Sequence, residues 1–589
     1  MHLKNSRSFR FLSLLFTGLF FLFYSTGCLE QRSPDKSLSG EPDNGGLLLP
    51  GGFEAIVVNE DSIGPARHLS VRDNGDIYVK FRWVEDAGSM AALRDTTGDG
   101  RTDIVRHFGD YDPGSRHSGI EVRNGYLYYS TDLHVYRYRL TPGRLLPEGP
   151  PDTLVIDDHE HGIHQHITKP LVFDNRGNMF VPFGVPSNAC QDPPRIPGAP
   201  GVDPCPELEN HGGIWVFDEN RENQTQSDGY RYATGLRSIV AMDWNPVDNQ
   251  LYVVQHGRDH LNRNWPEHYS SWDNAVLPAE EFVRVSEGSN FGWPYCYYDQ
   301  IQEKKVLAPE YGGDGNIVGR CSEFEDPLIG FPGHFAPNAL LFYEGDQFPG
   351  RYKNGAFIAF HGSTIRTPYP QAGYFVAFVP FEEGQYSGDW EVFANGFAGV
   401  DPVVNTRDAK HRPMGLTTGP DGSLYISDSV MGKIWRIIYT GDRDDFGEEQ
   451  LARMNEEKRT ATNIRTPHRT EDNLQTGIAP AGENIYRRYC ADCHQSDGQG
   501  SSPRFPPLAD TDWVTGSSKR LISIILNGMA GPIMVRDEHY DSVMPAHDFL
   551  SDEDVAEVAT YIRQNFGNRA SAVSENEVEE IRNKTGGDD

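Results

Sequence analysis

The segment Asp421-Gly422-Ser423-Leu424-Tyr425-Ile426 shows the pattern that decides the fold, because similar segments recur along the chain. Each is a turn containing glycine or asparagine, followed by a short strand rich in β-branched and aromatic residues. The other copies are residues 74–79, 124–129, 177–181, 249–253 and 354–358. Asn-Gly and Asp-Gly supply the positive φ that a tight hairpin needs. Six hairpins without helical periodicity between them predict a mostly β fold, a six-bladed β-propeller, since radial repetition leaves no long open sheet edge.

A second regularity concerns the strand that precedes each turn. Its start repeatedly carries a cationic or imidazole residue: Arg67 and His68, His117, His166, Arg237, His334 and Arg412. The innermost strands of a propeller line its central channel, so these side chains are predicted to meet at one end of the axis. Such a group suits an anionic ligand. The alternative is that scattered His and Arg residues merely cap strand ends.

The sequence Cys490-Ala491-Asp492-Cys493-His494 is the C-x-x-C-H pattern for attachment of haem c. Cys490 and Cys493 add to the haem vinyl groups, and His494 becomes the proximal iron ligand. Helices are predicted over residues 479–489 and 551–566. Met544, just before the second helix, is the predicted axial ligand; Met534 competes with it, and Met544 as core filler is the third interpretation. Only two thiols lie in this region, which disfavours a redox CxxC pair or a zinc site. A small all-α class I cytochrome c domain with one haem is expected.

The N-terminus has the composition of a targeting segment. Basic residues precede an apolar run over residues 11–24, which is too short for a stable membrane span. Ser25-Thr26-Gly27-Cys28 resembles a bacterial lipobox, so Cys28 is predicted to be lipid-modified after residues 1–27 are removed. An ordinary signal peptide with an incidental cysteine is the alternative. The chain is therefore expected to be exported and lipid-anchored to the cell envelope, on the periplasmic side or at the outer membrane or cell surface.

Charge and cysteine usage agree with export. The formal net charge is −32, which disfavours nucleic acid as a partner because phosphate binding needs a basic surface. Four cysteines remain outside the lipobox and the haem motif. Closeness in sequence favours Cys190–Cys205 and Cys296–Cys321 among the three possible pairings. Free buried thiols are the alternative.

Several propeller segments resemble the soluble aldose and sorbosone dehydrogenases that bind pyrroloquinoline quinone (PQQ) in a six-bladed propeller. They are His166-Ile167-Thr168-Lys169-Pro170, Gly235-Leu236-Arg237, Gly292-Trp293-Pro294-Tyr295, His361-Gly362-Ser363 and Arg412-Pro413. The resemblance runs from about residue 66 to 438 and rests on the order of the segments. The C-terminal part resembles the cytochromes fused to such dehydrogenases.

The resemblance implies a role for individual residues. His166 would be the general base for the substrate hydroxyl, and Arg237 would stabilise the oxyanion at C5 of the quinone. Arg366 and Arg412 would pair with the cofactor carboxylates. Backbone carbonyls near Gly257 and Arg258 would hold Ca²⁺.

The sequence departs from the family pattern at two places. Ser238 stands where the glucose-oxidising members carry Asn, and His256-Gly257-Arg258-Asp259 replaces their Gly-Pro calcium turn. An Arg258 side chain that points into the channel is an open alternative, and it would shift the pairing of the carboxylates.

Two further patterns have competing interpretations. One is the alternation of four imidazoles, His159, His161, His164 and His166, which could bind a transition metal if they share one face of a strand. The other interpretation is that they belong to a loop that leads into the channel. Residues 95–103 could form a calcium loop, but Arg106 stands where an EF-hand has its bidentate Glu. A structural turn is predicted there.

These observations predict an ordered set of segments. They are a signal peptide (1–27), a tether (28–48), the propeller (49–440), an exposed charged linker (441–477), the cytochrome c domain (478–569) and an acidic disordered tail (570–589). The predicted protein is a quinohaemoprotein dehydrogenase that oxidises a sugar or polyol with PQQ and Ca²⁺, and passes electrons through haem c to an external acceptor, a cytochrome or the quinone pool. The alternative is a cofactor-free propeller that serves as a carbohydrate- or partner-binding module on an electron-carrier cytochrome. A multi-haem enzyme is disfavoured by the single haem motif.

Overall fold

The computed structural model describes residues 38–85, 88–109, 118–159, 165–469, 481–502 and 504–585. By its internal contacts the chain divides after Ser37, and everything described below belongs to the second unit, which starts at Leu38. The predicted signal peptide and Cys28 lie outside the described residues, as do His117, His161 and His164.

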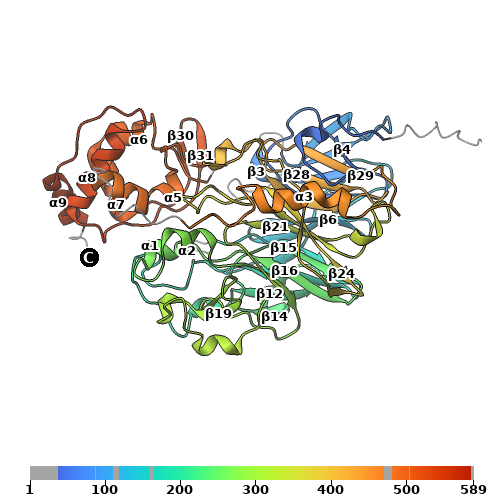
Figure 1. Cartoon of the computed structure of the whole chain (residues 1–589), viewed down its shortest axis with the longest axis horizontal. Helices are drawn as coiled ribbons and strands as arrows, with labels where there is room; N and C mark the ends of the chain where they lie inside the picture. The colour runs from blue at the N-terminus through green and yellow to red at the C-terminus, as the bar shows by residue number, and fades with distance from the viewer. Residues whose placement is uncertain are drawn as a thin grey trace, which may run out of the picture. The chain divides into compact units, whose positions relative to one another are not determined.

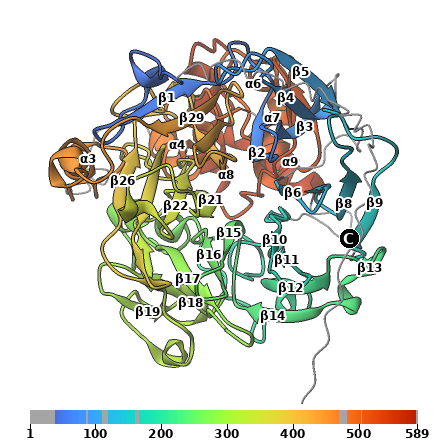
Figure 2. The same cartoon turned by 90° about the vertical axis from the view of Figure 1, so that its right-hand side faces the viewer.

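Six β-sheets follow one another around a centre, which confirms the predicted six-bladed propeller (Figures 1 and 2). The first blade contains β2 (Ala66–Val71), β3 (Ile77–Glu85), β4 (Gly88–Arg94) and β5 (Ile104–Phe108). The second contains β6 (Ile120–Arg123), β7 (Tyr126–Ser130), β8 (His134–Arg139), β9 (Asp152–Ile156) and β13 (Gln224–Thr225). The third contains β10 (Val172–Phe173), β11 (Asn178–Phe183), β12 (Gly213–Asp218) and β14 (Tyr230–Thr234). The next two comprise β15 (Ile239–Asn245), β16 (Gln250–Gln255), β17 (Glu280–Val285) and β20 (Ile329–Phe331); and β21 (Pro337–Phe342), β22 (Ala356–Phe360), β23 (Phe375–Val379) and β26 (Glu391–Ala394).

The sixth blade joins the two ends of the propeller. It contains β27 (Pro413–Thr418), β28 (Leu424–Asp428), β29 (Ile434–Tyr439) and β1 (Phe53–Val57). Strand β1 pairs with β29 in antiparallel register, from Phe53 opposite Tyr439 to Val57 opposite Trp435. The first strand of the propeller thus completes its last sheet and closes the ring.

Each predicted turn joins the first strand of a blade to the second, which confirms all six hairpins. Asn124 and Gly125, between β6 and β7, both have positive φ, 51° and 78°. Two consecutive residues in this region are what a tight I′-type hairpin requires. The turn chemistry in the sequence therefore positions each innermost strand.

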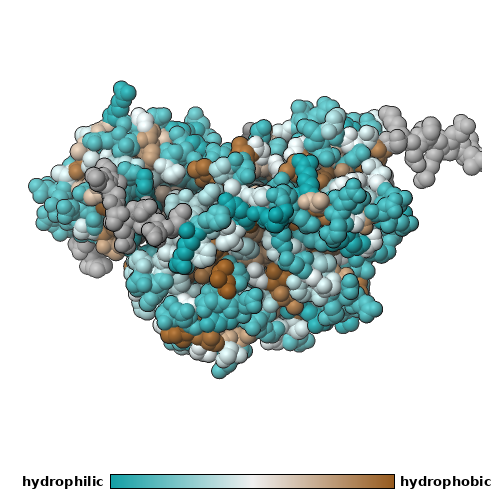
Figure 3. All heavy atoms as spheres, in the orientation of Figure 1, coloured by the Kyte–Doolittle hydropathy of each residue, from teal (hydrophilic) through white to brown (hydrophobic). Residues whose placement is uncertain are grey.

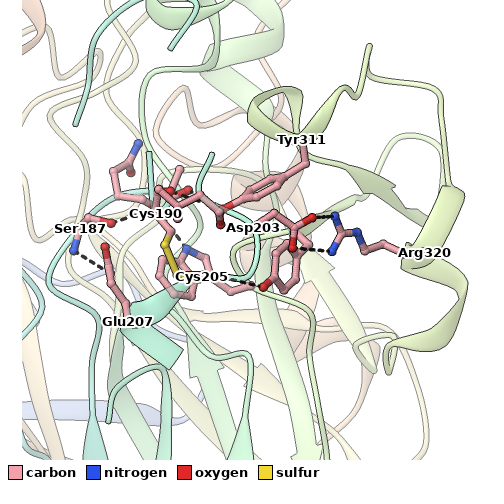
Figure 4. The surroundings of a disulfide bond; sticks show 12 residues. Ser187, Cys190, Asp203, Cys205, Glu207, Tyr311 and Arg320 are labelled. Atoms are coloured by element: carbon pink, nitrogen blue, oxygen red, sulfur yellow. Dashed lines mark hydrogen bonds and ion pairs between the residues drawn. A yellow bond between two sulfur atoms is a disulfide. The ribbon is translucent and has the colours of Figure 1, made fainter. Parts of the chain in front are cut away.

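Two long loops of the fourth blade together form an insertion. The loop between β16 and β17 contains α1 (Leu261–Asn264) and α2 (Ser271–Val276), and the loop between β17 and β20 contains the hairpin of β18 (Cys296–Asp299) and β19 (Lys304–Leu307). Both favoured disulfides, Cys190–Cys205 and Cys296–Cys321, are present. An ion pair between Asp203 and Arg320 links the two disulfide-bonded loops, and Cys205 N donates a 3.0 Å hydrogen bond to Tyr295 Oη (Figure 4).

The C-terminal part is the predicted small helical domain. Its elements are α4 (Ala481–Tyr489), α5 (Ala491–His494), α6 (Asp512–Thr515), α7 (Ser518–Asn527), β30 (Ile533–Val535), β31 (Glu538–Tyr540), α8 (Asp552–Gln564) and α9 (Glu575–Thr585). Ser551 caps α8 by accepting a hydrogen bond from Asp554 N, and the Asp554 side chain accepts one from Ser551 N. Figure 1 shows these helices gathered into one body.

Two predicted segment properties are wrong. The tail is predicted to be disordered, but residues 575–585 form α9, because Val578 and Ile581 share one helix face and are buried in the core of the helical domain. The segment 441–477 is predicted to be exposed, but α3 (Glu448–Thr460) buries Leu451 and Met454. In both segments, a few apolar residues at helical spacing form a buried helix face, although most of the residues are charged.

The surface agrees with the acidic composition. The face drawn in Figure 3 is mostly hydrophilic, with separate apolar patches. No helix among the described residues is both long and apolar enough to cross a membrane.

Candidate active site

Most of the predicted channel residues line one cavity at the ends of the innermost strands. Its lining includes Arg67, His166, Arg237, His334 and Arg412. Further polar lining residues include Arg82, Gln165, Ser238, His256, Asp259, Glu280, Asn338, His361, Ser363 and Arg504. Five arginines against two carboxylates make the cavity cationic, as an anionic ligand requires. Strand-end capping alone does not explain a shared cavity.

His166 presents an uncharged base to this cavity. Burial, followed by the charge of Arg237, holds the pKa of His166 well below its usual value. Among the described residues its Nε2 has no hydrogen-bond partner. The backbones of Gly184 and His166 approach so closely that only glycine fits at position 184, because a Cβ there would lie 2.0 Å from the His166 carbonyl oxygen. A neutral imidazole with a vacant nitrogen can accept a proton from a ligand.

Arg237 is held by a dense set of acceptors. It donates from Nη1 to the Gly257 carbonyl (2.7 Å) and from Nε to the Asn188 carbonyl (3.1 Å). Its Nη2 lies 3.3 Å from Asp259 Oδ2. Burial lowers the pKa of Arg237 to about 10, so the guanidinium stays charged at neutral pH. Burial alone would raise the pKa of Asp259, but Arg237 and other cations lower it well below its usual value.

The predicted calcium position does not fit the structure. The Gly257 carbonyl is already bound by the Arg237 guanidinium, so a calcium ion at that oxygen would be repelled by the positive charge of Arg237. Arg258 does not point into the channel either, because its buried side chain binds Glu310 of the insertion. Within the described part of the chain, no cluster of three or more His, Cys, Asp or Glu residues could hold a metal ion. The residues that replace the family's Gly-Pro turn therefore do not fit Ca²⁺ at the Gly257 carbonyl.

Arg366 does not line the cavity, unlike Arg412. Its side chain is fully buried, and its Nε and Nη1 have no hydrogen-bond partner among the described residues. The preceding residues, Thr364 and Ile365, do line the cavity. Arg412 donates to the carbonyls of His361 and Gly362, which directs its guanidinium along the cavity wall. Only Arg412 of this pair is placed for a cofactor carboxylate.

Three other predicted residues have structural contacts. His68 lies outside the lining and its Nε2 is 2.7 Å from the Asn338 carbonyl. His159 Nδ1 is 3.0 Å from Asp157 Oδ1, while two of its three predicted metal-site companions lie outside the described residues. Asp95 accepts hydrogen bonds from the backbone N–H groups of Gly98 and Gly100, which agrees with a structural turn.

A second cavity lies in the helical domain and contains the haem motif. Cys490 and Cys493 are free thiols that line it together with His494 and Met544. His494 Nδ1 lies 2.9 Å from the Pro506 carbonyl, which fixes the ring and leaves Nε2 for a metal. The rest of the lining is mainly apolar, including Leu508, Val514, Leu521, Ile525, Val558 and Ile562. Thiols, imidazole, thioether and apolar walls together fit a covalently bound haem.

The cavity distinguishes between the candidate axial ligands. Met534 is 45% exposed on β30 and is absent from the lining. Met544 lines the cavity, as does Met529, which the sequence did not single out. The backbones of these two residues exchange hydrogen bonds of 2.9 Å in each direction. The structure thus favours Met544 over Met534 and adds Met529 as a neighbour.

The propeller also contributes to the haem cavity. Arg263 of α1 lines it, and its Nη2 lies 2.8 Å from His547 Nε2. His260 Nδ1 is 3.3 Å from Oδ2 of Asp492, which stands between the two motif cysteines. Sequence reasoning missed Arg263, Arg504 and Asp259. Asp259 belongs to the segment His256-Gly257-Arg258-Asp259, to which the sequence analysis gave no role for the Asp259 side chain, whereas no sequence motif marks the two arginines.

A six-bladed propeller with a cationic channel, followed by a helical domain with a haem cavity, defines a two-domain protein in which the propeller is joined to a cytochrome c. Residues 52–440 match the family model described as TrAA12-like, and residues 479–566 match the cytochrome c model. The chain belongs to the TrAA12-like family and ends in a cytochrome c domain.

Individual proteins resemble the propeller and the cytochrome domain separately. The holo PQQ domain of a pyranose dehydrogenase from Coprinopsis cinerea has a similar fold, with a TM-score of 0.53 and 17% identity over 67% of this chain and 97% of that one. Cytochrome c-552 of Thermus thermophilus is 38% identical over 16% of this chain and 68% of its own length. An uncharacterized protein of Borreliella burgdorferi is 28% identical over 35% of this chain, which spans 48% of that protein.

Proposed function

We propose that the protein is a quinohaemoprotein dehydrogenase that oxidises a sugar or polyol in the propeller channel and passes the electrons to its own haem c. The observation that carries this proposal is the shared cationic cavity, in which His166, Arg237 and Arg412 meet Arg504 of the cytochrome domain. Membership of the TrAA12-like family and the fold shared with a pyranose dehydrogenase PQQ domain support it.

PQQ would fit this cavity because its carboxylates need cationic partners, which Arg412 and Arg504 offer. When bound, PQQ supplies an acceptor for the two electrons that leave the substrate carbon as hydride. His166 would accept the hydroxyl proton at Nε2 while the hydride leaves the carbon that bears this hydroxyl, so the alcohol becomes a carbonyl. Arg237, held by Asn188 and Asp259, keeps a fixed positive charge beside the reaction and needs no reorganisation.

The cytochrome domain would take the electrons one at a time. His494 and Met544 would hold the iron, and a thioether ligand favours a potential high enough to accept electrons. An external acceptor, such as a second cytochrome or the quinone pool, would then reoxidise the haem.

Reconstitution tests the proposal directly. The full-length holocytochrome is incubated with PQQ, with and without Ca²⁺, and a panel of aldoses and polyols is added while haem absorption is followed. Haem reduction by at least one substrate, lost in His166→Asn, is expected. No quinone binding and no reduction with any substrate would favour the alternative, a cofactor-free carbohydrate- or partner-binding module.

We also propose that the chain is exported and anchored to the cell envelope through a lipid on Cys28. The lipobox-like sequence and the two disulfides support this placement. Metabolic labelling with a fatty acid should mark the wild-type protein and not Cys28→Ser. Equal labelling of both would refute lipid attachment at Cys28.

A further inference from the structure

Arg504 lies where the two cavities approach each other. Among the described residues it is the one that lines both the channel cavity and the haem cavity. On one side of it, Ser501 and Ser502 face the channel; on the other, Phe505 and Pro506 face the haem site. The segment that carries Arg504 is therefore a wall common to both sites.

This wall is attached firmly to both domains. On the haem side, Gly500 N donates to the His494 carbonyl at 2.9 Å, and the Pro506 carbonyl lies 2.9 Å from His494 Nδ1. On the propeller side, Thr406 Oγ1 donates to Ser501 Oγ at 2.6 Å. An ion pair of 2.6 Å between Arg407 and Asp497 strengthens the same contact. The segment that carries Arg504 is thus bound both to the proximal haem ligand and to the propeller loop that contains Thr406 and Arg407.

The charge of Arg504 reaches into the channel. It is one of the cations that depress the pKa of His166, after burial and Arg237. No ion pair of Arg504 with a carboxylate is found in the described part of the chain, although two acidic residues line the channel. A guanidinium left without a carboxylate at this position can receive an anion from the channel.

We propose that Arg504 couples the two sites electrostatically, so that an anion bound in the channel and the electron on the haem compete for the same positive charge. This inference rests on the proposed presence of haem c, but not on dehydrogenase activity. A positive charge near the iron favours the reduced haem, and an anion that neutralises this charge favours the oxidised haem. By linkage, the anion must bind more tightly to the oxidised protein than to the reduced one.

Redox titration of the full-length holocytochrome tests the coupling, with citrate as a redox-inert tricarboxylate probe. In wild type, citrate should lower the haem midpoint potential. A tenfold preference of citrate for the oxidised form corresponds to about 59 mV for one electron. Arg504→Gln should have a lower potential without citrate and should lose the citrate response, whereas Arg504→Lys should keep a weaker response.

Lys519→Gln is the matched control, because Lys519 is exposed on α7 of the same domain and its loss removes the same charge. This variant should keep the wild-type potential and citrate response. An Arg504→Gln protein that retains the citrate response, or whose potential equals that of the control, would overturn the inference. The readout needs neither PQQ nor substrate, so a failure of the proposed dehydrogenase activity would be seen separately.

Discussion

Arg263 Nη2 of the propeller insertion lies 2.8 Å from His547 Nε2 of the cytochrome domain, and both side chains are buried. Since arginine only donates, the neutral imidazole accepts. Burial, together with Arg263, lowers the pKa of His547 to about 3. The propeller thus supplies a permanent cation to the wall of the haem cavity.

Arg263→Ala should weaken the association of the two domains. The substitution leaves His547 Nε2 buried without its donor, a loss of about 1–3 kcal/mol. Urea unfolding followed through haem absorption should show a lower midpoint than wild type. Arg453→Ala, on the exposed side of α3, is the comparison variant and should unfold like wild type. Equal midpoints for both variants would show that the contact does not stabilise the domain.

The activity should not fall as the pH drops through 6.5, the ordinary pKa of histidine. Burial and Arg237 lower the pKa of His166, so its neutral, proton-accepting form persists below that pH and is lost only in more acid solution. The initial rate of substrate-driven haem reduction, measured across the acid range, checks this expectation.

Arg237→Gln removes the second cause of the depressed pKa of His166. The pH at which the rate begins to fall in acid solution should therefore rise toward 6.5, independently of any change in the maximal rate. If this pH does not change, Arg237 does not control the protonation of His166. His166→Asn should lower the rate by about 10²–10⁴, the usual contribution of a general base.

Calcium should not stabilise this protein as it would if Gly257 and Arg258 formed a site. Because the Gly257 carbonyl binds Arg237, thermal unfolding in Ca²⁺ should match that in Mg²⁺ or a chelator. A site filled at 100 times its Kd would add about 2.7 kcal/mol, which is readily measured. A stabilisation specific to Ca²⁺ would contradict the arrangement around Arg237.

Replacement of the axial methionine should separate the three candidates. Met544→His should lower the haem reduction potential, because a thioether ligand raises the potential. Met534→Leu should leave it unchanged, since Met534 lies outside the cavity. If Met529→Leu rather than Met544→His changes the potential, Met529 is the ligand.

The sequence predicted the features that local chemistry determines. Turns such as Asn124-Gly125 require positive φ, and thus reveal the blades; the two cysteines and His494 reveal the haem site. The position predicted for calcium does not fit because Arg237, from a separate segment of the chain, binds the Gly257 carbonyl. Arg263 and Arg504 could not be recognised for a similar reason, because each reaches the cavity of the other domain. The helix α9 escaped notice because two buried residues, Val578 and Ile581, stand among charged ones.

The pairing of β1 with β29 has a consequence for how the chain matures. Residues 53–57 must wait for residues 435–439 before they can form the hydrogen bonds of this strand pair, so the sixth blade cannot be finished until nearly the whole propeller sequence has been made. Contacts of such large sequence separation form slowly, and the unpaired first strand is meanwhile open to wrong partners. The cytochrome segment, which follows residue 439, is therefore synthesised just as the ring becomes able to close.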